Sequence, residues 1–102
     1  MKERLKKITK GPPNKKYTAV VEDIVTKKTR KISFGASGYQ QFRDSTKLRL
    51  YSDGDHRDVL RRKKYFSRHS GGRTTKSAAL AYEKKKSGGR YTAKILSHSF
   101  LW

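Results

Sequence analysis

The sequence contains no cysteine and only eight acidic residues, against 27 lysines and arginines. Without cysteine, the chain can form neither a disulfide framework nor a thiolate metal site, which fits a reducing compartment. No apolar run approaches the length of about 18 residues that a membrane-spanning helix needs, and the basic N-terminus lacks the apolar segment of a secretory signal. We therefore expect a protein that is neither secreted nor transmembrane, although its charge would suit an anionic membrane surface.

Apolar residues are also scarce, at 32% of 102 residues, and the net charge is +19. A chain of this length and composition can form one domain with a small core, to which the 11% of aromatic residues contribute large buried areas. The charge is uneven, at +6 over residues 1–16, +2 over 17–58 and +11 over 59–102. This distribution predicts a folded centre whose basic ends reach for polyanions or acidic protein surfaces.

A β-hairpin is predicted over residues 17–34. Residues 17–21 (YTAVV) are rich in strand formers, and residues 30–34 (RKISF) alternate between apolar and polar side chains. The turn is expected near residues 26–29, where charged and polar residues replace the apolar ones.

The composition of the residues before the hairpin is typical of an extension outside the folded domain. Residues 1–16 are strongly basic, and Gly11-Pro12-Pro13-Asn14 stops any helix that Leu5 and Ile8 would begin. We therefore predict a basic N-terminal arm over residues 1–16, which is either a solvated disordered tail or an arm that becomes ordered on a partner, and a single small domain over residues 17–102.

The best helix candidate is the segment 53–69 (DGDHRDVLRRKKYFSRH), in which aspartates come first and cations last. This order suits the helix dipole, and Asp53 or Asp55 is the expected N-cap. At 3.6 residues per turn the segment has two stripes. The stripe predicted to pack inward comprises Val59, Leu60, Lys63 and Phe66. The stripe predicted to face a negative partner comprises Arg61, Lys64, Tyr65 and Arg68.

A second helix is predicted over residues 77–84, capped by Thr74 or Thr75 and rich in alanine. The tail that follows closes on Phe100-Leu101-Trp102, which either folds back on the core or serves as an apolar anchor in a pocket of a neighbouring protein. The predicted class is therefore α+β, with a small β-hairpin or sheet followed by two short helices, a basic N-terminal arm and an apolar C-terminal tail.

The residue types that carry catalysis or bind metals lack the necessary spacing. Aspartates surround His56, but the acids and glycine of a calcium-binding EF-hand loop are missing, and no nucleophile motif of the G-x-S-x-G kind occurs. Gly35-Ala36-Ser37-Gly38 lacks the lysine and glycine spacing of a phosphate-binding P-loop, and predicts a tight turn instead. We expect no enzymatic activity, no cofactor and no metal site.

Clusters of lysine and arginine are the strongest functional feature of the sequence. Such clusters bind phosphates in a salt-dependent way without reading base sequence, and no base-reading motif is present. Acidic protein neighbours remain the alternative partner of the same charges. The predicted polyanion or partner contacts are Arg61, Arg62, Lys64, Tyr65, Arg68, Lys84, Lys85 and Lys86, and the predicted interface anchor is Phe100, Leu101 and Trp102.

The order of several motifs resembles a family of small basic proteins encoded by nucleocytoplasmic large DNA viruses. The resemblance covers residues 17–102, and it departs from the family's aromatic-rich tail in the Lys/Gly insert at 84–90. Its main motifs are FGAxGY at residues 34–39 and RxxYxxRH at residues 62–69. They lie among Tyr17-Thr18-Ala19-Val20-Val21, Asp44, Asp55-His56, Ala93-Lys94-Ile95-Leu96-Ser97-His98 and the closing Leu101-Trp102. The resemblance carries no catalytic role to any residue, and it implies a component of the virion.

Three functions are therefore open from the sequence. The first is a minor capsid protein that links shell proteins to each other or to the underlying membrane or genome, located in the virion and in the host cytoplasm during assembly. The second is a nucleic-acid-binding packaging protein, and the third is an RNA-binding protein of the ribosomal type. The corresponding partners are capsid or other virion proteins, DNA through its phosphates, or an anionic membrane surface.

Overall fold

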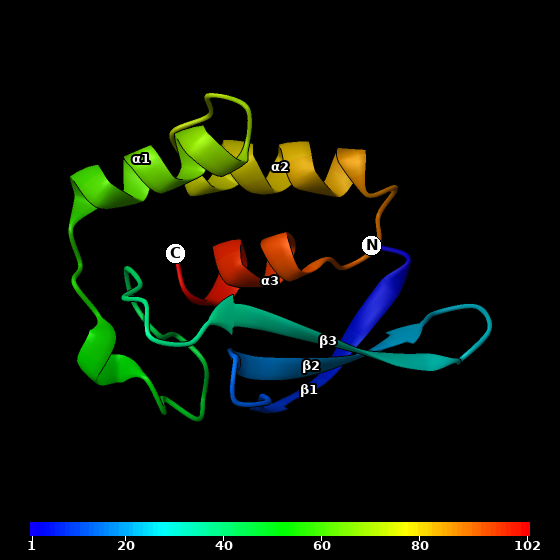
Figure 1. Cartoon of the computed structure of the whole chain (residues 1–102). Coiled ribbons are helices and arrows are strands. Elements are labelled where there is room, and N and C mark those ends of the chain that lie inside the picture. Colours follow the sequence, from blue (N-terminus) through cyan, green and yellow to red (C-terminus); the bar gives the residue numbers. More distant parts are fainter.

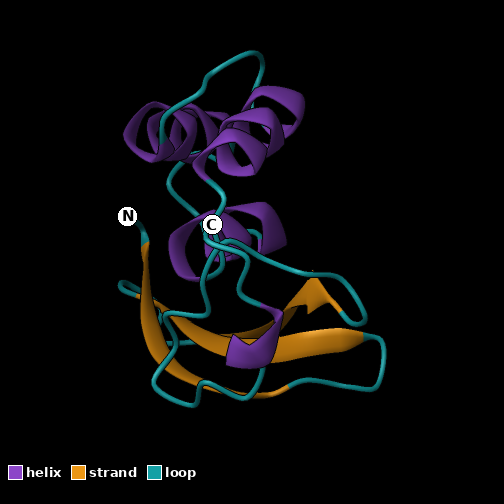
Figure 2. Cartoon of the chain, turned by 90° about the vertical axis from the view of Figure 1, so that its left-hand side faces the viewer, coloured by secondary structure: helices purple, strands orange, loops and turns teal.

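The computed structural model describes residues 1–102 as a three-stranded antiparallel sheet and three α-helices. The elements form three layers (Figure 1). Helix α3 (Ala93–Phe100) packs on β3 (Thr29–Ala36), and helix α2 (Lys76–Lys86) packs on α3. Figure 2 shows the same order from the side, with one helix between the strands and the other two helices. The predicted α+β class is confirmed, with three helices in place of two.

The predicted hairpin is formed by β2 (Lys15–Asp23) and β3, which pair antiparallel from Glu22 opposite Thr29 to Lys15 opposite Ala36. Its turn begins at Asp23, whose carboxylate accepts hydrogen bonds of 2.9 Å from the backbone N–H groups of Val25 and Thr26. Aspartate favours turns for this reason, because its side chain satisfies backbone donors two and three residues on.

The predicted N-terminal arm is wrong in its structure, because residues 3–10 form strand β1 (Glu3–Lys10) at the edge of the sheet. The pairing of β1 with β2 shifts between Leu5 and Lys7. A bulge of this kind inserts one extra residue into a strand. It places Leu5 and Ile8 on the same face although they are three residues apart, and both pack against the core. The segment that was assigned to a separate arm therefore completes the sheet.

Helix α1 (Val59–His69) begins later than the predicted segment 53–69. Its N-cap is Asp58, and neither Asp53 nor Asp55, because the Asp58 carboxylate accepts hydrogen bonds from the backbone of Leu60 (3.0 Å) and Arg61 (3.2 Å). The preceding residues 52–54 form one short 3-10 turn. The N-cap accepts hydrogen bonds from backbone N–H groups of the first turn, which have no carbonyl of a preceding helical turn to bond with.

The inward stripe predicted for α1 is only partly correct. Phe66 is fully buried, but the side chains of Val59 and Leu60 are 51% and 61% exposed. Phe66 lies against the ring of His98 on α3, with centroids 5.1 Å apart. The apolar residues of the first turn of α1 therefore stay at the surface, and the second half of the helix makes the core contact.

Helix α2 confirms the second predicted helix, and Thr75 is its cap. The tail contains a third helix, α3, whose N-cap Thr92 accepts a 3.1 Å hydrogen bond from the backbone of Ile95. Leu101 is 1% exposed and belongs to the core with Tyr17 and Phe34. Of the two predicted alternatives, the structure therefore shows the tail folded back on the core. None of the helices is long and apolar enough to cross a membrane.

The long connection between β3 and α1 is held by buried polar groups. Asp44 accepts hydrogen bonds from the hydroxyls of Tyr17 and Thr46, and Gln41 donates to Asp55 over 2.6 Å. Both Asp44 and Gln41 are almost completely buried. Because buried polar groups are costly unless they are paired, these contacts fix the path of a segment whose only regular secondary structure is the short 3-10 turn at residues 52–54.

Candidate functional site

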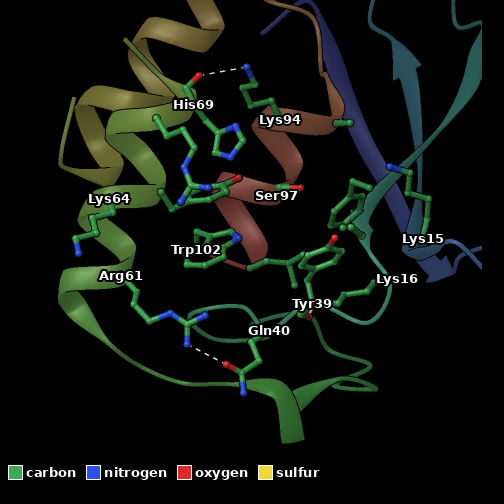
Figure 3. A pocket seen from close by; sticks show the side chains of 17 residues that line it. Lys15, Lys16, Tyr39, Gln40, Arg61, Lys64, His69, Lys94, Ser97 and Trp102 are labelled. Atoms are coloured by element: carbon green, nitrogen blue, oxygen red, sulfur yellow. Dashed lines mark hydrogen bonds between the residues drawn. The ribbon is translucent and has the colours of Figure 1, made fainter. Parts of the chain in front are cut away.

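A cleft of about 700 Å³ lies between α1 and the sheet, where α3 and the residues that follow it meet both layers (Figure 3). We call it the basic cleft, because six of its lining residues are cationic and none has an acidic side chain. The six cations are Lys15, Lys16, Arg61, Lys64, Arg68 and Lys94. A concave surface of one charge raises the local potential and concentrates counter-ions of the opposite charge.

One wall of the cleft is a row of cations on α1. Arg61, Lys64 and Arg68 are spaced by three and four residues, which places them on one face of a helix. All three side chains are exposed. Together with Tyr65 they are the outward stripe that the sequence predicted, and the structure places all four residues in this cleft. In Figure 3, Arg61 reaches from α1 toward Gln40, whereas the side chain of Lys64 extends along the outer side of the helix.

The cations of the opposite wall were not predicted. Lys15 and Lys16 begin β2, and Lys94 lies in the first turn of α3. The side chain of Lys16 is 3% exposed and donates hydrogen bonds to Gln41 and to the carbonyl of Tyr39. Burial lowers the pKa of Lys16, and nearby carboxylates partly oppose this shift. Lys16 therefore shapes the wall, whereas Lys15 and Lys94 are less buried.

Aromatic residues stand among these cations. The rings of Tyr65 and Trp102 are stacked, with centroids 4.1 Å apart and planes inclined by 6°. The ring of Tyr39, by contrast, is part of a side chain that is 74% exposed. The indole N–H of Trp102 makes no hydrogen bond within the protein and is not buried. In Figure 3, Trp102 lies on the α1 side of the cleft and Tyr39 on the sheet side.

Two hydrogen bonds cross the cleft (Figure 3). The guanidinium of Arg61 donates to the side-chain oxygen of Gln40 over 2.9 Å. The amine of Lys94 donates to the backbone carbonyl of His69 over 3.2 Å. Both acceptors are neutral, so that the positive charges of Arg61 and Lys94 remain uncompensated.

The acidic residues of the protein are used elsewhere. Glu3 pairs with Arg30 at 2.8 Å, and Glu22 pairs with Arg4 at 2.6 Å. No ion pair of the structure contains a cation of the basic cleft. The balanced part of the charge therefore stabilises the sheet, and the excess positive charge is available for a ligand.

The remaining predicted contacts lie outside the cleft. Arg62 points away from the row, with its guanidinium 4.3 Å from the centre of the Phe42 ring. The run Lys84–Lys86 occupies the last turn of α2 and does not line the cleft. The predicted set of polyanion contacts therefore divides into one group at the cleft and one group on a separate surface.

The predicted interface anchor is also divided by the fold. Leu101 is a core residue, and Phe100 packs with Phe34 at a centroid distance of 6.3 Å. Trp102 is half-buried and lines the cleft. Leu101 is therefore not available to a neighbouring protein, because its burial on this protein's own core is already complete.

The histidines have local structural contacts. His98 is fully buried and hydrogen-bonded to Tyr65 (3.0 Å) and Ser70 (2.7 Å). Burial, assisted by His69, Lys94 and Lys76, lowers the pKa of His98 to about 4. No group of three or more histidine, cysteine or acidic side chains is placed to hold a metal ion.

Comparison of the chain with protein-family models, with curated proteins and with solved structures finds no match. The resemblance to the viral family therefore stays a prediction.

Proposed function

We propose that this protein binds nucleic acid through phosphate groups, without reading base sequence, and that the basic cleft is the principal contact. The observation that carries the proposal is the lining of the cleft, which has six cationic side chains and no acidic one. Binding at such a site releases counterions from the nucleic acid and is therefore strongly salt-dependent. The net charge of +19 would also accelerate encounter with a polyanion.

The packaging role predicted from sequence fits this proposal better than the other two functions. The cationic row of α1 and the walls facing it offer charge and hydrogen-bond donors. A packaging protein must bind any stretch of a genome, and contacts to phosphate serve that purpose because every nucleotide carries one.

The test is a salt titration of binding to random-sequence oligonucleotides, single-stranded and duplex, plotted as log K against log salt. The informative variant is Arg61→Gln, Lys64→Gln and Arg68→Gln combined. Its matched control is the combined change of Lys84, Lys85 and Lys86 to Gln, which removes the same charge outside the cleft. We expect the cleft variant to reduce the steepness of the salt dependence by about 2 to 3, at roughly 0.7–0.9 for each phosphate contact.

The control should stay close to the unmodified protein in both affinity and salt dependence. If the two variants lose affinity equally, only overall charge matters and the cleft is not the site. If the unmodified protein binds neither form of nucleic acid at about 150 mM salt, where the non-specific affinities of phosphate-binding proteins are still about 10⁻⁴ to 10⁻⁶ M, the proposed function is wrong.

We propose the minor capsid role as the second candidate. It is favoured by the resemblance to viral proteins and by the exposed apolar side chains of Val59 and Leu60 at the start of α1, which would suit a protein neighbour. A capsid linker should remain with the shell of purified virus particles after nuclease treatment and a wash in high salt. A packaging protein held through phosphates should be released under the same conditions.

A further inference from the structure

We propose that the basic cleft takes a single strand of nucleic acid, with a base stacked on Tyr39 beside Trp102 and the phosphates on the cationic row of α1. This inference rests on the proposed function and adds the strand state and an aromatic contact to it.

Tyr39 is an exposed aromatic side chain at a site where the backbone is fixed. Its side chain is 74% exposed, and no other aromatic ring of the protein stacks against it. Its backbone carbonyl, however, accepts a hydrogen bond from the buried Lys16. A ring that is open to solvent within a basic cleft, on a backbone that is anchored, has the properties of a stacking platform for an unpaired base.

Trp102 supplies the other side of the same space. Tyr65 covers one face of the Trp102 indole, so a base cannot stack on that face. The indole N–H of Trp102, however, has no partner in the protein. This donor is available to a base edge or to a phosphate oxygen. Tyr39 and Trp102 face the cleft from its two sides (Figure 3). A base bound between them would meet the exposed ring of Tyr39 on one side and the indole N–H of Trp102 on the other.

The cleft selects against a duplex by its shape. A duplex keeps its bases stacked inside a convex cylinder, so the phosphates could reach the rim but no base could reach Tyr39 without being flipped out. A single strand can enter the cleft and present both its phosphates and an unpaired base. Other proteins that bind single strands combine a basic groove with aromatic stacking platforms in the same way. The row from Arg61 to Arg68 covers about 10 Å at 1.5 Å per residue, which is the length of about three stacked nucleotides at 3.4 Å each.

The chain provides its own reporter, because Trp102 is the single tryptophan of the sequence and lines the cleft. The experiment is a titration of the full chain, followed by tryptophan fluorescence, with four probes of equal phosphate count. These are oligothymidylate, oligouridylate, a random-sequence duplex and inorganic polyphosphate. We expect both single strands to change the fluorescence and to bind at least about tenfold more tightly than the duplex or the polyphosphate, which has no bases.

The variant that isolates the stacking contact is Tyr39→Ala. It should weaken single-strand binding by about fivefold to 100-fold, the range known for loss of one base–aromatic stack, and leave polyphosphate binding unchanged. Tyr39→Phe, which keeps the ring, should restore the affinity. Leu48→Ala is the control, since Leu48 is an exposed residue of the same connection that does not line the cleft.

Equal binding of the two single strands would mean that neither the sugar nor the methyl group of thymine is read. Tighter binding of oligouridylate, which must also hold against oligodeoxyuridylate with the same base, would identify RNA as the natural strand. Either result supports the inference. Equal affinity for single strand, duplex and polyphosphate, or an unchanged affinity of Tyr39→Ala for oligothymidylate, would overturn it. If such binding still depended on Arg61, Lys64 and Arg68, the proposed function would stand and only the strand preference would be wrong.

Discussion

The ring of Tyr65 lies parallel to the indole of Trp102, at a centroid distance of 4.1 Å. The same tyrosine points its hydroxyl at Nδ1 of His98, 3.0 Å away. Ser70 donates to Glu83 over 3.1 Å and therefore accepts a hydrogen bond from Nε2 of His98. The neutral imidazole then leaves Nδ1 as the acceptor for the Tyr65 hydroxyl. Tyr65 thus borders the cleft with its ring and joins α1 to α3 with its hydroxyl.

Removal of that hydroxyl tests the link between the cleft and the helical layers. Tyr65→Phe keeps the ring on Trp102 but leaves the buried Nδ1 of His98 without a donor. We expect the free energy of unfolding to fall by about 1–3 kcal/mol, the cost of an unsatisfied buried polar atom. Urea unfolding followed by the fluorescence of Trp102 measures this change. An unchanged stability would contradict the network.

An alanine substitution at Gly35 tests how closely Leu101 packs on the sheet. Its φ is +78°, and a Cβ added there would lie 2.8 Å from Cδ1 of Leu101. Gly38 has a similar φ of +83°, but an added Cβ would meet nothing within 4 Å. Gly38→Ala should therefore cost only the backbone strain, about 1–2 kcal/mol, whereas Gly35→Ala should cost about 1–3 kcal/mol more through overpacking.

Thermal or urea unfolding of the two glycine variants gives the comparison directly. The difference between them reports the crowding at Gly35, because the backbone term is shared, and the nearest atom there is Cδ1 of Leu101, with Cβ and Cδ of Lys16 at 3.2 and 3.3 Å. Equal destabilisation of the two variants would show that the tail does not press on Gly35.

The parts of the fold that depend on local sequence could be predicted. The hairpin follows from strand-forming residues on either side of a polar turn, and helix α2 from its alanines and the Thr75 cap. The row Arg61, Lys64 and Arg68 could be predicted as one face because the spacing depends only on helix geometry. That these three side chains line the same cleft therefore follows in part from their local spacing on one helix.

The parts that depend on distant contacts could not be predicted. Strand β1 was missed because a bulge near Leu5 disturbs the alternation by which strands are recognised. Helix α3 has only eight residues and is stabilised by burial of Ile95 and Leu96, as short helices require tertiary packing. Lys94 was also missed, because a single lysine forms no pattern in the sequence and only the tertiary fold brings it to the cleft.

Glu3 joins the start of β1 to β3 and to the segment before α3, and its loss should be costly. It is 3% exposed, accepts two hydrogen bonds of 2.8 Å from Arg30, and accepts a third from the backbone of Tyr91. Arg30 lowers the pKa of Glu3, with Tyr91 and Arg90 contributing. We expect Glu3→Ala to lower the free energy of unfolding by about 2 kcal/mol, less than a fully buried pair because the side chain of Arg30 is 45% exposed.

Glu22→Ala is the matched control for Glu3, since Glu22 pairs with Arg4 on the same sheet and that arginine is 59% exposed. Exposed pairs contribute little, so this variant should unfold close to the unmodified protein. Chemical denaturation of both variants checks the prediction. If Glu3→Ala were as stable as Glu22→Ala, the contacts of Glu3 with Arg30 and Tyr91 would contribute no more than an exposed ion pair.

The buried His98 predicts how stability depends on pH. Its pKa of about 4 in the folded protein lies below the ordinary value of 6.5, so between these values the unfolded chain binds the proton and the folded protein does not. The stabilisation is therefore complete above pH 6.5 and is lost as the pH falls toward 4. Between pH 7 and pH 5 this single group should reduce the free energy of unfolding by about 2 kcal/mol.

Urea unfolding at pH 7, 6 and 5 measures that loss, and the range avoids the carboxylates, which titrate at lower pH. His98→Gln removes the titrating group and should flatten the dependence, although it will lower stability at every pH because its contacts with Tyr65 and Ser70 are disturbed. His56 and His69, whose pKa values are also lowered by burial, contribute in the same direction and remain in the variant. An NMR titration that found His98 protonating near pH 6.5 would contradict the buried neutral ring on which both the Tyr65 contact and the cleft wall depend.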